Sequence, residues 1–103
     1  MKLSILDYVP IFEGRNAYDA FNHSITLAQT AEQLGYTRYW VAEHHNVFSV
    51  ASSAPEIVMM MLLEQTQTIK IGSGGVMLPH YSAYKVAEQF RIMEARHPNS
   101  CLL

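Results

Sequence analysis

The chain has 103 residues and a mass of 11.7 kDa, so it forms one domain at most. Apolar residues make up 50% and charged residues only 16%, against roughly 25% charged in an average globular protein. Because so small a chain has much surface for its volume, this low charge indicates that another molecule covers part of it. Seven basic and nine acidic residues give a net charge of -2 with no basic stripe, which argues against a nucleic-acid binder.

The sequence also bears on the compartment. Cys101 is the single cysteine, so the chain forms no internal disulfide and fits a reducing environment. The longest unbroken apolar run, residues 57–63, is far shorter than the roughly 20 residues of a membrane span. The N-terminal apolar run stops at Asp7, too early for the core of a signal peptide. We therefore expect a cytoplasmic protein with no membrane segment.

The first half of the chain predicts a strand, a helix and a second strand. Residues 3–6 form a short apolar run, and the strand must end before Pro10, which has no amide hydrogen to donate. From Tyr18 onward apolar residues recur at spacings of three and four, as in an amphipathic helix, and Gly35 marks its end. The aromatic and β-branched residues at 38–42 predict the second strand.

The second predicted helix covers residues 56–68. Ser53 and Glu56 stand three residues apart, as in a capping box, and predict its beginning. The helix is apolar around most of its circumference, including the three methionines at 59–61, and methionine is common where helices pack. A helix that is apolar nearly all round is buried on more than one side, so in this short chain it predicts a partner.

The remaining elements complete an alternating pattern. A third strand is expected to begin at Ile69 and to continue toward Pro79, and a third helix begins near Ser82 and ends before Pro98. The order strand, helix, strand, helix, strand, helix predicts an α/β fold with parallel strands and right-handed crossovers.

Unusual residues follow the strands of this predicted sheet. They are Asp7, the run at 43–45 and the glycine-rich run at 72–75, and the core needs none of them. In parallel α/β folds the loops after the strands converge and carry the chemistry. Adjacent residues of an extended chain point to opposite faces, so Glu43, His44 and His45 do not predict a metal site. A histidine here suits proton transfer, or instead it caps the backbone while Glu43 pairs with an arginine; both interpretations stay open.

Gly74 and Gly75 have two interpretations as well. The run lacks the G-x-G-x-x-G spacing of a dinucleotide-binding turn. Consecutive glycines at a strand end fit either the close approach of a flat ligand to the backbone or a simple kink in a barrel strand. The tyrosines at 81 and 84 could suggest a cofactor site, but packing explains them at least as well.

Three segments together resemble the bacterial luciferase-like flavin monooxygenases. They are residues 40–45, 71–79 and 85–91, and the match is best with the luciferase family oxidoreductases that share the blocks AEHHN and GSGGVMLP. The resemblance extends over residues 1–99 without an evident gap. It implies the first three β/α units of a TIM (β/α)8 barrel, truncated before the fourth.

The resemblance also implies a chemistry. Members of this family bind FMN, usually as reduced flavin supplied by a separate reductase, and oxidise aldehydes or other small organic substrates with O2. By this resemblance His44 is the active-site histidine, and Glu43, Gly74 and Gly75 bind the cofactor. A non-proline cis peptide is expected at Gly74–Gly75, against the flavin ring. FMN is favoured over a deazaflavin by the subgroup match alone.

The chain departs from the family after Asn99. Residues 100–103 do not match the family's fourth strand, which carries a reactive cysteine and leads to an arginine that holds the flavin phosphate. Cys101 is not equated with that cysteine, because its surroundings differ. Three strands of an eight-stranded barrel would leave two open edges and one bare face, which recruit other chains. We therefore expect a homo-oligomer, at least a dimer, through the second and third helices, as the family resemblance implies.

Two functions remain in competition. The first is a flavin-dependent monooxygenase of which this chain is the N-terminal part. The second is a non-catalytic, truncated remnant that folds by self-association and lacks the flavin phosphate site. Between them lies a protein that binds a flat ligand without turnover.

Overall fold

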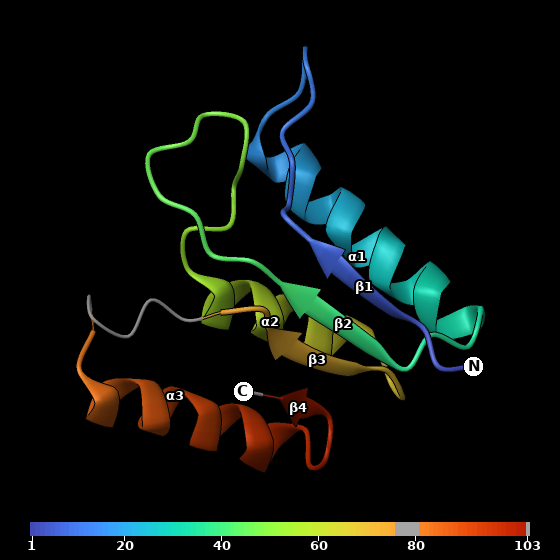
Figure 1. Cartoon of the computed structure of the whole chain (residues 1–103), viewed down its shortest axis with the longest axis vertical. Coiled ribbons are helices and arrows are strands. Elements are labelled where there is room, and N and C mark those ends of the chain that lie inside the picture. Colours follow the sequence, from blue (N-terminus) through green and yellow to red (C-terminus); the bar gives the residue numbers. More distant parts are fainter. Residues whose placement is uncertain (76–80, 103) are drawn as a thin grey trace.

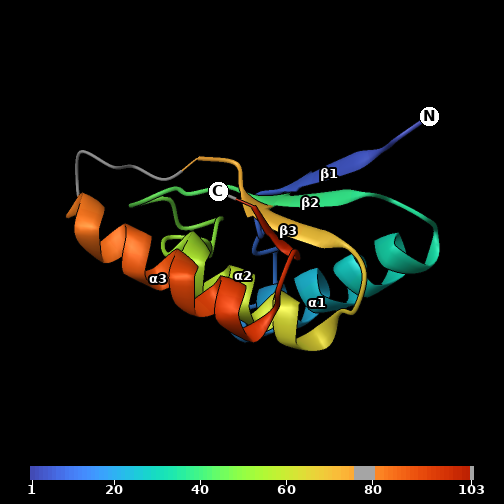
Figure 2. The same cartoon turned by 90° about the horizontal axis from the view of Figure 1, so that it is seen from below.

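Parallel strands and helices alternate along the chain, as the sequence predicts. The computed structural model describes residues 1–75 and 81–102, and in these residues the strands form one sheet in the order β1-β2-β3-β4. All neighbouring strands are parallel. The elements are β1 (Ser4–Asp7), α1 (Ala17–Gln33), β2 (Arg38–Val41), α2 (Pro55–Gln65), β3 (Lys70–Ser73), α3 (Ala83–Arg96) and β4 (Cys101–Leu102). The three helices cover one face of the sheet (Figures 1 and 2).

The hydrophobic core lies between the sheet and these helices. Tyr39 and Ile71 point into it from the strands, and Met59, Leu62 and Leu63 meet them from α2; all five are at most 1% exposed. Helix α2 contacts α1 on one side and α3 on the other. Much of its apolar circumference is therefore covered within this chain, and the part that remains exposed lies around Ile57.

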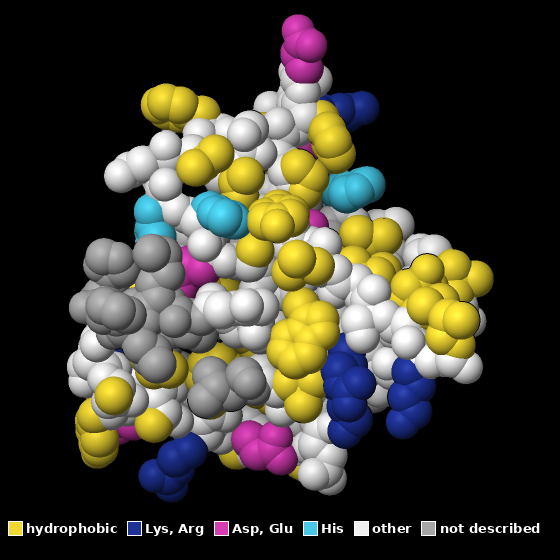
Figure 3. All heavy atoms as spheres, viewed as in Figure 1, with side chains coloured by type: hydrophobic (Ala, Val, Ile, Leu, Met, Phe, Trp, Pro, Cys, Tyr) yellow, Lys and Arg dark blue, Asp and Glu magenta, His cyan; other side chains and the backbone are white. Residues whose placement is uncertain are grey.

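The opposite face of the sheet carries an apolar row. Leu6, Trp40, Gly72 and Leu102 are aligned across the four strands by their register. The side chain of Leu6 is 54% exposed, and apolar side chains are visible on this face in Figure 3. The absence of a side chain at Gly72 leaves room for Trp40 and Leu102 on either side. A Cβ atom there would lie 2.7 Å from Cζ3 of Trp40 and 2.8 Å from Cβ of Leu102.

The predicted capping box of the second helix is wrong. Helix α2 begins at Pro55, its N-cap is Ala54, and no side chain caps it. Proline favours the first helical position, so it fixes the start of the helix and leaves Ser53 one residue too early to cap it. A capping box exists instead at α1, where Asn16 Oδ1 accepts from the amide of Asp19 at 3.0 Å and the Asp19 carboxylate accepts from the amide of Asn16.

The count of three strands is one too few. Cys101 and Leu102, in the segment that does not resemble the family's fourth strand, pair in parallel with Ile71 and Gly72 as β4. Asn99 makes the preceding turn with a φ of +64°, and its carbonyl accepts from Nζ of Lys70. A strand of two residues has no measurable alternation of apolar and polar side chains, so the sequence pattern did not reveal it.

No helix within the described part of the chain is long and apolar enough to cross a membrane.

Candidate functional site

The predicted site residues meet because three strands end at the same level. Asp7, Val41 and Ser73 are aligned in register at the carboxyl ends of β1, β2 and β3. Backbone bonds continue this alignment, from the amide of Ala42 to the carbonyl of Asp7 (3.0 Å) and from the amide of Gly74 to the carbonyl of Val41 (2.7 Å). The residues that follow each strand are therefore brought to one edge of the sheet.

A hollow of about 310 Å³ lies at this edge, and all four predicted site residues line it. Its lining residues are Leu6, Tyr8, Ala42, Glu43, His44, Gly74 and Gly75. We call this hollow the strand-end hollow. The sequence placed Glu43, His44 and the two glycines at strand ends but gave no signal for Tyr8, which lies just beyond β1.

His44 is held in the wall of the strand-end hollow by its backbone and by a ring contact. Its amide donates to the carbonyl of Ser52 at 2.9 Å, and the buried Ser52 hydroxyl donates to the carbonyl of Ala42 at 2.6 Å. These two bonds close the loop that leaves β2. The imidazole lies 5.2 Å from the ring of Tyr8, measured between ring centroids, with the planes tilted by 34°. An imidazole placed this way can give or take a proton inside the hollow.

The Glu43 carboxylate lies beneath this loop and is almost fully buried. Its side chain is 1% exposed, and Oε2 accepts from the hydroxyl of Tyr81 at 2.8 Å and lies 2.6 Å from Nε2 of His45. The hydrogen bond to Glu43, together with burial, raises the pKa of Tyr81 to about 12. Tyr81, which the sequence assigned to packing, instead joins the β2 loop to the segment before α3.

The two glycines have different surroundings. A Cβ atom on Gly74 would lie 3.1 Å from Cδ1 of Leu6, so a larger residue there would press on the Leu6 side chain. A Cβ atom on Gly75 would meet no atom of residues 1–75 and 81–102 within 4 Å. Packing against these described residues therefore does not explain Gly75, whereas a ligand that approaches the backbone would. The expectation of a cis peptide at Gly74–Gly75 is wrong for this structure, because every peptide bond between described residues is trans.

Asp7 corrects another expectation. The sequence pattern indicates a residue that the core does not need, but the side chain of Asp7 is buried and hydrogen-bonded. Its Oδ2 accepts from the hydroxyls of Ser24 (2.6 Å) and Tyr39, and its Oδ1 accepts from the amide of Val9 (2.8 Å). The carboxylate thus joins β1, α1 and β2 directly behind the strand-end hollow.

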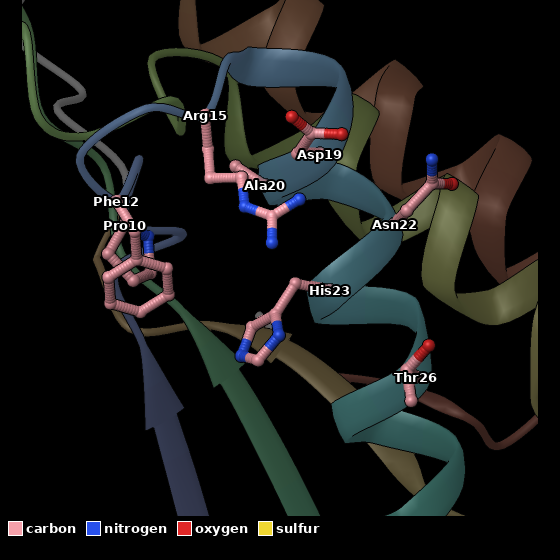
Figure 4. A pocket seen from close by; sticks show the side chains of 8 residues that line it. All are labelled: Pro10, Phe12, Arg15, Asp19, Ala20, Asn22, His23 and Thr26. Atoms are coloured by element: carbon pink, nitrogen blue, oxygen red, sulfur yellow. The ribbon is translucent and has the colours of Figure 1, made fainter.

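A larger hollow, of about 420 Å³, lies between α1 and the segment after β1 that carries Pro10 and Phe12 (Figure 4). Arg15 and His23 reach into it, and the ring of Phe12 meets the imidazole of His23 edge-on. Most of its lining side chains are exposed, and none of the predicted site residues is among them. Within residues 1–75 and 81–102, no group of three histidine, cysteine or acidic side chains could hold a metal ion.

Curated relatives match this chain over nearly its whole length. The N-acetyl-S-alkylcysteine monooxygenase of Bacillus subtilis is 53% identical over 98 residues, which is 95% of this chain and 29% of that protein. The protein called luciferase-like monooxygenase of Escherichia coli is 48% identical over 95 residues, 92% of this chain and 28% of that protein. The chain therefore spans less than a third of the length of these relatives.

Solved structures share the same arrangement. The crystal structure of apo-MsnO8 superposes with a TM-score of 0.96 at 45% identity, covering 99% of this chain and 31% of that one. The oxygenating constituent of 3,6-diketocamphane monooxygenase from Pseudomonas putida, solved in complex with FMN, gives a TM-score of 0.82 at 25% identity, covering 94% of this chain and 28% of that one. Residues 1–95 match the family described as luciferase-like monooxygenase, and the chain belongs to that family.

Proposed function

We propose that this chain is the N-terminal part of a flavin-dependent monooxygenase, with the strand-end hollow as the place where the flavin ring binds. The observation that carries the proposal is that Glu43, His44, Gly74 and Gly75 line one hollow, in which a Cβ atom on Gly75 would meet no described residue within 4 Å. A similar protein of the same family was solved with FMN, which favours FMN as the cofactor. The substrates would be O2 and an aldehyde or another small organic molecule, and a separate reductase would supply the reduced flavin.

The side chains of the hollow suit such a ligand. At Gly75 a Cβ atom would meet no described residue within 4 Å, which leaves room for a ring against the backbone. His44 presents an imidazole that can hold or move a proton beside it, and the buried Glu43 fixes the loop that carries His44. When bound, reduced flavin supplies the electrons that activate O2. The chain's own residues bind and orient the ring and handle the proton.

The second candidate, a non-catalytic remnant, also has an observation in its favour. Leu6, which lines the hollow, is 54% exposed, so this side of the hollow is open to solvent. Oxygen chemistry on a flavin requires a preorganised site that excludes water. In this alternative the chain keeps the family's fold but does not hold the cofactor.

A binding titration separates the two candidates. Reduced FMN is added anaerobically to the purified chain, and the absorbance and fluorescence of the flavin are followed to saturation. The variant Gly75→Val places a branched side chain in the open space beside the backbone. The variant Ala95→Val makes a comparable addition on the exposed surface of α3 and serves as the control.

The flavin proposal expects saturable binding that is weakened at least tenfold in Gly75→Val, a loss of about 1.4 kcal/mol, and unchanged in Ala95→Val. If no binding is seen at about 1 mM reduced FMN, the binding free energy is weaker than about 4 kcal/mol. That result supports the non-catalytic remnant. Equal binding by both variants would move the site away from the strand-end hollow.

We further propose that the chain self-associates through α2 and α3. Ile57 on α2 is 60% exposed, and Met60 and Met61 beside it line a shallow apolar hollow. On α3, Tyr84 and Ile92 are 74% and 64% exposed. Light scattering should give at least a dimer that Ile57→Lys dissociates, whereas Leu34→Lys, at an exposed apolar position after α1, should not. A folded monomer at micromolar concentration would contradict this proposal.

A further inference from the structure

The backbone turns sharply just behind the strand-end hollow, at a residue type that avoids such turns. Val9 has a φ of +55° and is fully buried. A β-branched residue in this left-handed region is an outlier, because its Cβ substituents crowd the backbone. Such conformations persist only where the surroundings over-determine them, and they cluster at functional sites. The surroundings of Val9 therefore require an explanation.

The Asp7 carboxylate explains the left-handed turn at Val9. Its Oδ1 accepts from the amide of Val9 at 2.8 Å, so it bonds to the turn itself. Its Oδ2 is held by the hydroxyls of Ser24 and Tyr39, from α1 and β2. Burial and the bond to Asp7 raise the pKa of Tyr39 far above its ordinary value, so that hydroxyl remains a donor. The carboxylate is thus fixed from two elements while its other oxygen defines the turn.

The turn has two consequences for the strand-end hollow. The residue before it, Tyr8, lines the hollow and lies with its ring 5.2 Å from that of His44. The carbonyl of Val9 itself accepts from the amide of Ala51 at 2.9 Å, in the loop whose Ser52 holds the backbone of His44. Both rings are therefore placed by a chain of contacts that begins at Asp7.

We propose that Asp7 is a positioning residue for this site: it selects the left-handed turn at Val9 and thereby sets the ring of Tyr8 against His44. The inference rests on the proposed function only in giving His44 a role in the chemistry. Ser24 and Tyr39 hold the carboxylate, and Val9 transmits its position to the hollow. Asp7 itself does not line the hollow.

The test reads the position of the two rings directly, by the NMR signals of the His44 ring protons in the full chain. The Tyr8 ring shifts these signals, and Tyr8→Leu gives the position without that ring. Asp7→Asn keeps one acceptor oxygen but places an amide donor where the carboxylate accepts from the amide of Val9 and the hydroxyls of Ser24 and Tyr39. Ser24→Ala is the matched control, since it removes one bond to Oδ2 and leaves the bond from Oδ1 to Val9. The double variant Asp7→Asn/Val9→Gly provides a rescue, because glycine takes a positive φ unaided.

The proposal expects the His44 signals of Asp7→Asn to move at least halfway to those of Tyr8→Leu. Those of Ser24→Ala and of the double variant should stay near the parent. If Asp7→Asn loses stability as Ser24→Ala does but keeps the parental His44 signals, Asp7 is a purely structural residue and the proposal is overturned. If Asp7→Asn does not fold, the double variant Asp7→Asn/Val9→Gly is measured in its place. His44 signals of the double variant that match those of Tyr8→Leu would also overturn the proposal.

A parallel arm keeps this inference separate from the proposed function. Each variant is titrated anaerobically with reduced FMN. If the parent binds no flavin but the His44 signals follow the expected order, the positioning by Asp7 stands and the flavin function fails. If the parent binds flavin and the signals do not follow Asp7, the flavin function stands and the positioning by Asp7 is overturned.

Discussion

The two ends of the parallel sheet treat polar side chains in opposite ways. At the carboxyl ends of the strands, Asp7, Glu43, Ser52 and Ser73 are buried and bonded beneath the surface. At the amino ends, the side chain of Glu32 in α1 makes its hydrogen bonds at the surface. Its carboxylate accepts the amides of residues 67–69, which closes the turn into β3.

The difference shows at which end of the sheet the fold loses hydration by burying polar groups. A buried polar group loses its hydration and is tolerated only when hydrogen bonds replace it. An end of the sheet that serves only to connect elements can avoid that cost, as the turn at Glu32 does. The carboxyl ends instead concentrate buried polar groups and the left-handed turn at Val9 around one hollow. This contrast supports the proposal that the carboxyl ends are the functional end of the domain.

The largest expected effect lies on β3 and its extension, where two glycines differ. Gly72→Val would drive a side chain into Trp40 and Leu102, which approach to 2.7 and 2.8 Å of a Cβ atom, and should lower the free energy of unfolding by about 3 kcal/mol. Gly75→Ala, in open space, should change it by less than about 0.5 kcal/mol. Urea unfolding of both variants checks this, and equal losses would remove the distinction between a packed and an open glycine.

The next effect compares the two ends of the sheet directly. Tyr39→Phe deprives the buried Asp7 carboxylate of a donor and should lower the free energy of unfolding by about 1.5–3 kcal/mol. Thr37→Val removes an exposed hydrogen bond from its hydroxyl to the carbonyl of Leu3, at the other end of the sheet, and should cost less than about 1 kcal/mol. Thermal or urea unfolding measures both. A larger loss in Thr37→Val would reverse the comparison.

A smaller effect, with a pH dependence, is expected at Glu32. Burial raises the pKa of this carboxyl, but the amides of Thr68, Ile69 and Gln67 outweigh it, so the pKa is lowered. A carboxyl with a lowered pKa in the folded chain stabilises it above the unfolded pKa and loses that contribution as the pH falls through the folded value. Glu32→Gln should cost roughly 0.5–1.5 kcal/mol at neutral pH and almost nothing near pH 3. A loss that is equal at the two pH values would contradict this role for Glu32.

The smallest effect on stability is expected at Tyr81, whose signature is its titration. The pKa of about 12 means that its hydroxyl stays protonated while an exposed tyrosine ionises near 10. Rapid-mixing absorbance titration of the parent, with Tyr81→Phe to identify the signal, should show this late ionisation. Glu43→Gln should lower its midpoint toward the ordinary value. A midpoint near 10 in the parent would break the link between the β2 loop and α3.

The order of elements and the edge that carries the site follow from the sequence for a physical reason. Helix and strand periodicities are local properties, and parallel strands bring their carboxyl ends together whatever the side chains are. The pattern therefore predicted that Glu43, His44, Gly74 and Gly75 would share one edge, and they line one hollow. The third helix also begins where Ser82 predicts, with the Ser82 side chain accepting from the amide of Lys85.

The features that the sequence did not reveal depend on contacts between distant residues. Asp7 looked dispensable because its partners, Ser24 and Tyr39, lie 17 and 32 residues away. Tyr81 reaches Glu43 across 38 residues, and no local pattern announces that bond. The third strand was predicted to continue from Ile69 to Pro79, but β3 ends at Ser73, and the part of this prediction at residues 76–79 lies outside the described residues.

The most direct test of the account maps where flavin binds. Reduced FMN is titrated anaerobically into the isotope-labelled chain, and the backbone amide signals are followed by NMR. The account predicts that the signals of His44, Gly74 and Gly75 shift together and saturate at one concentration, while those of Arg15 and His23 in the hollow on α1 stay in place. Shifts confined to Arg15 and His23, or no saturable shift at all, would contradict the assignment of the strand-end hollow as the flavin site.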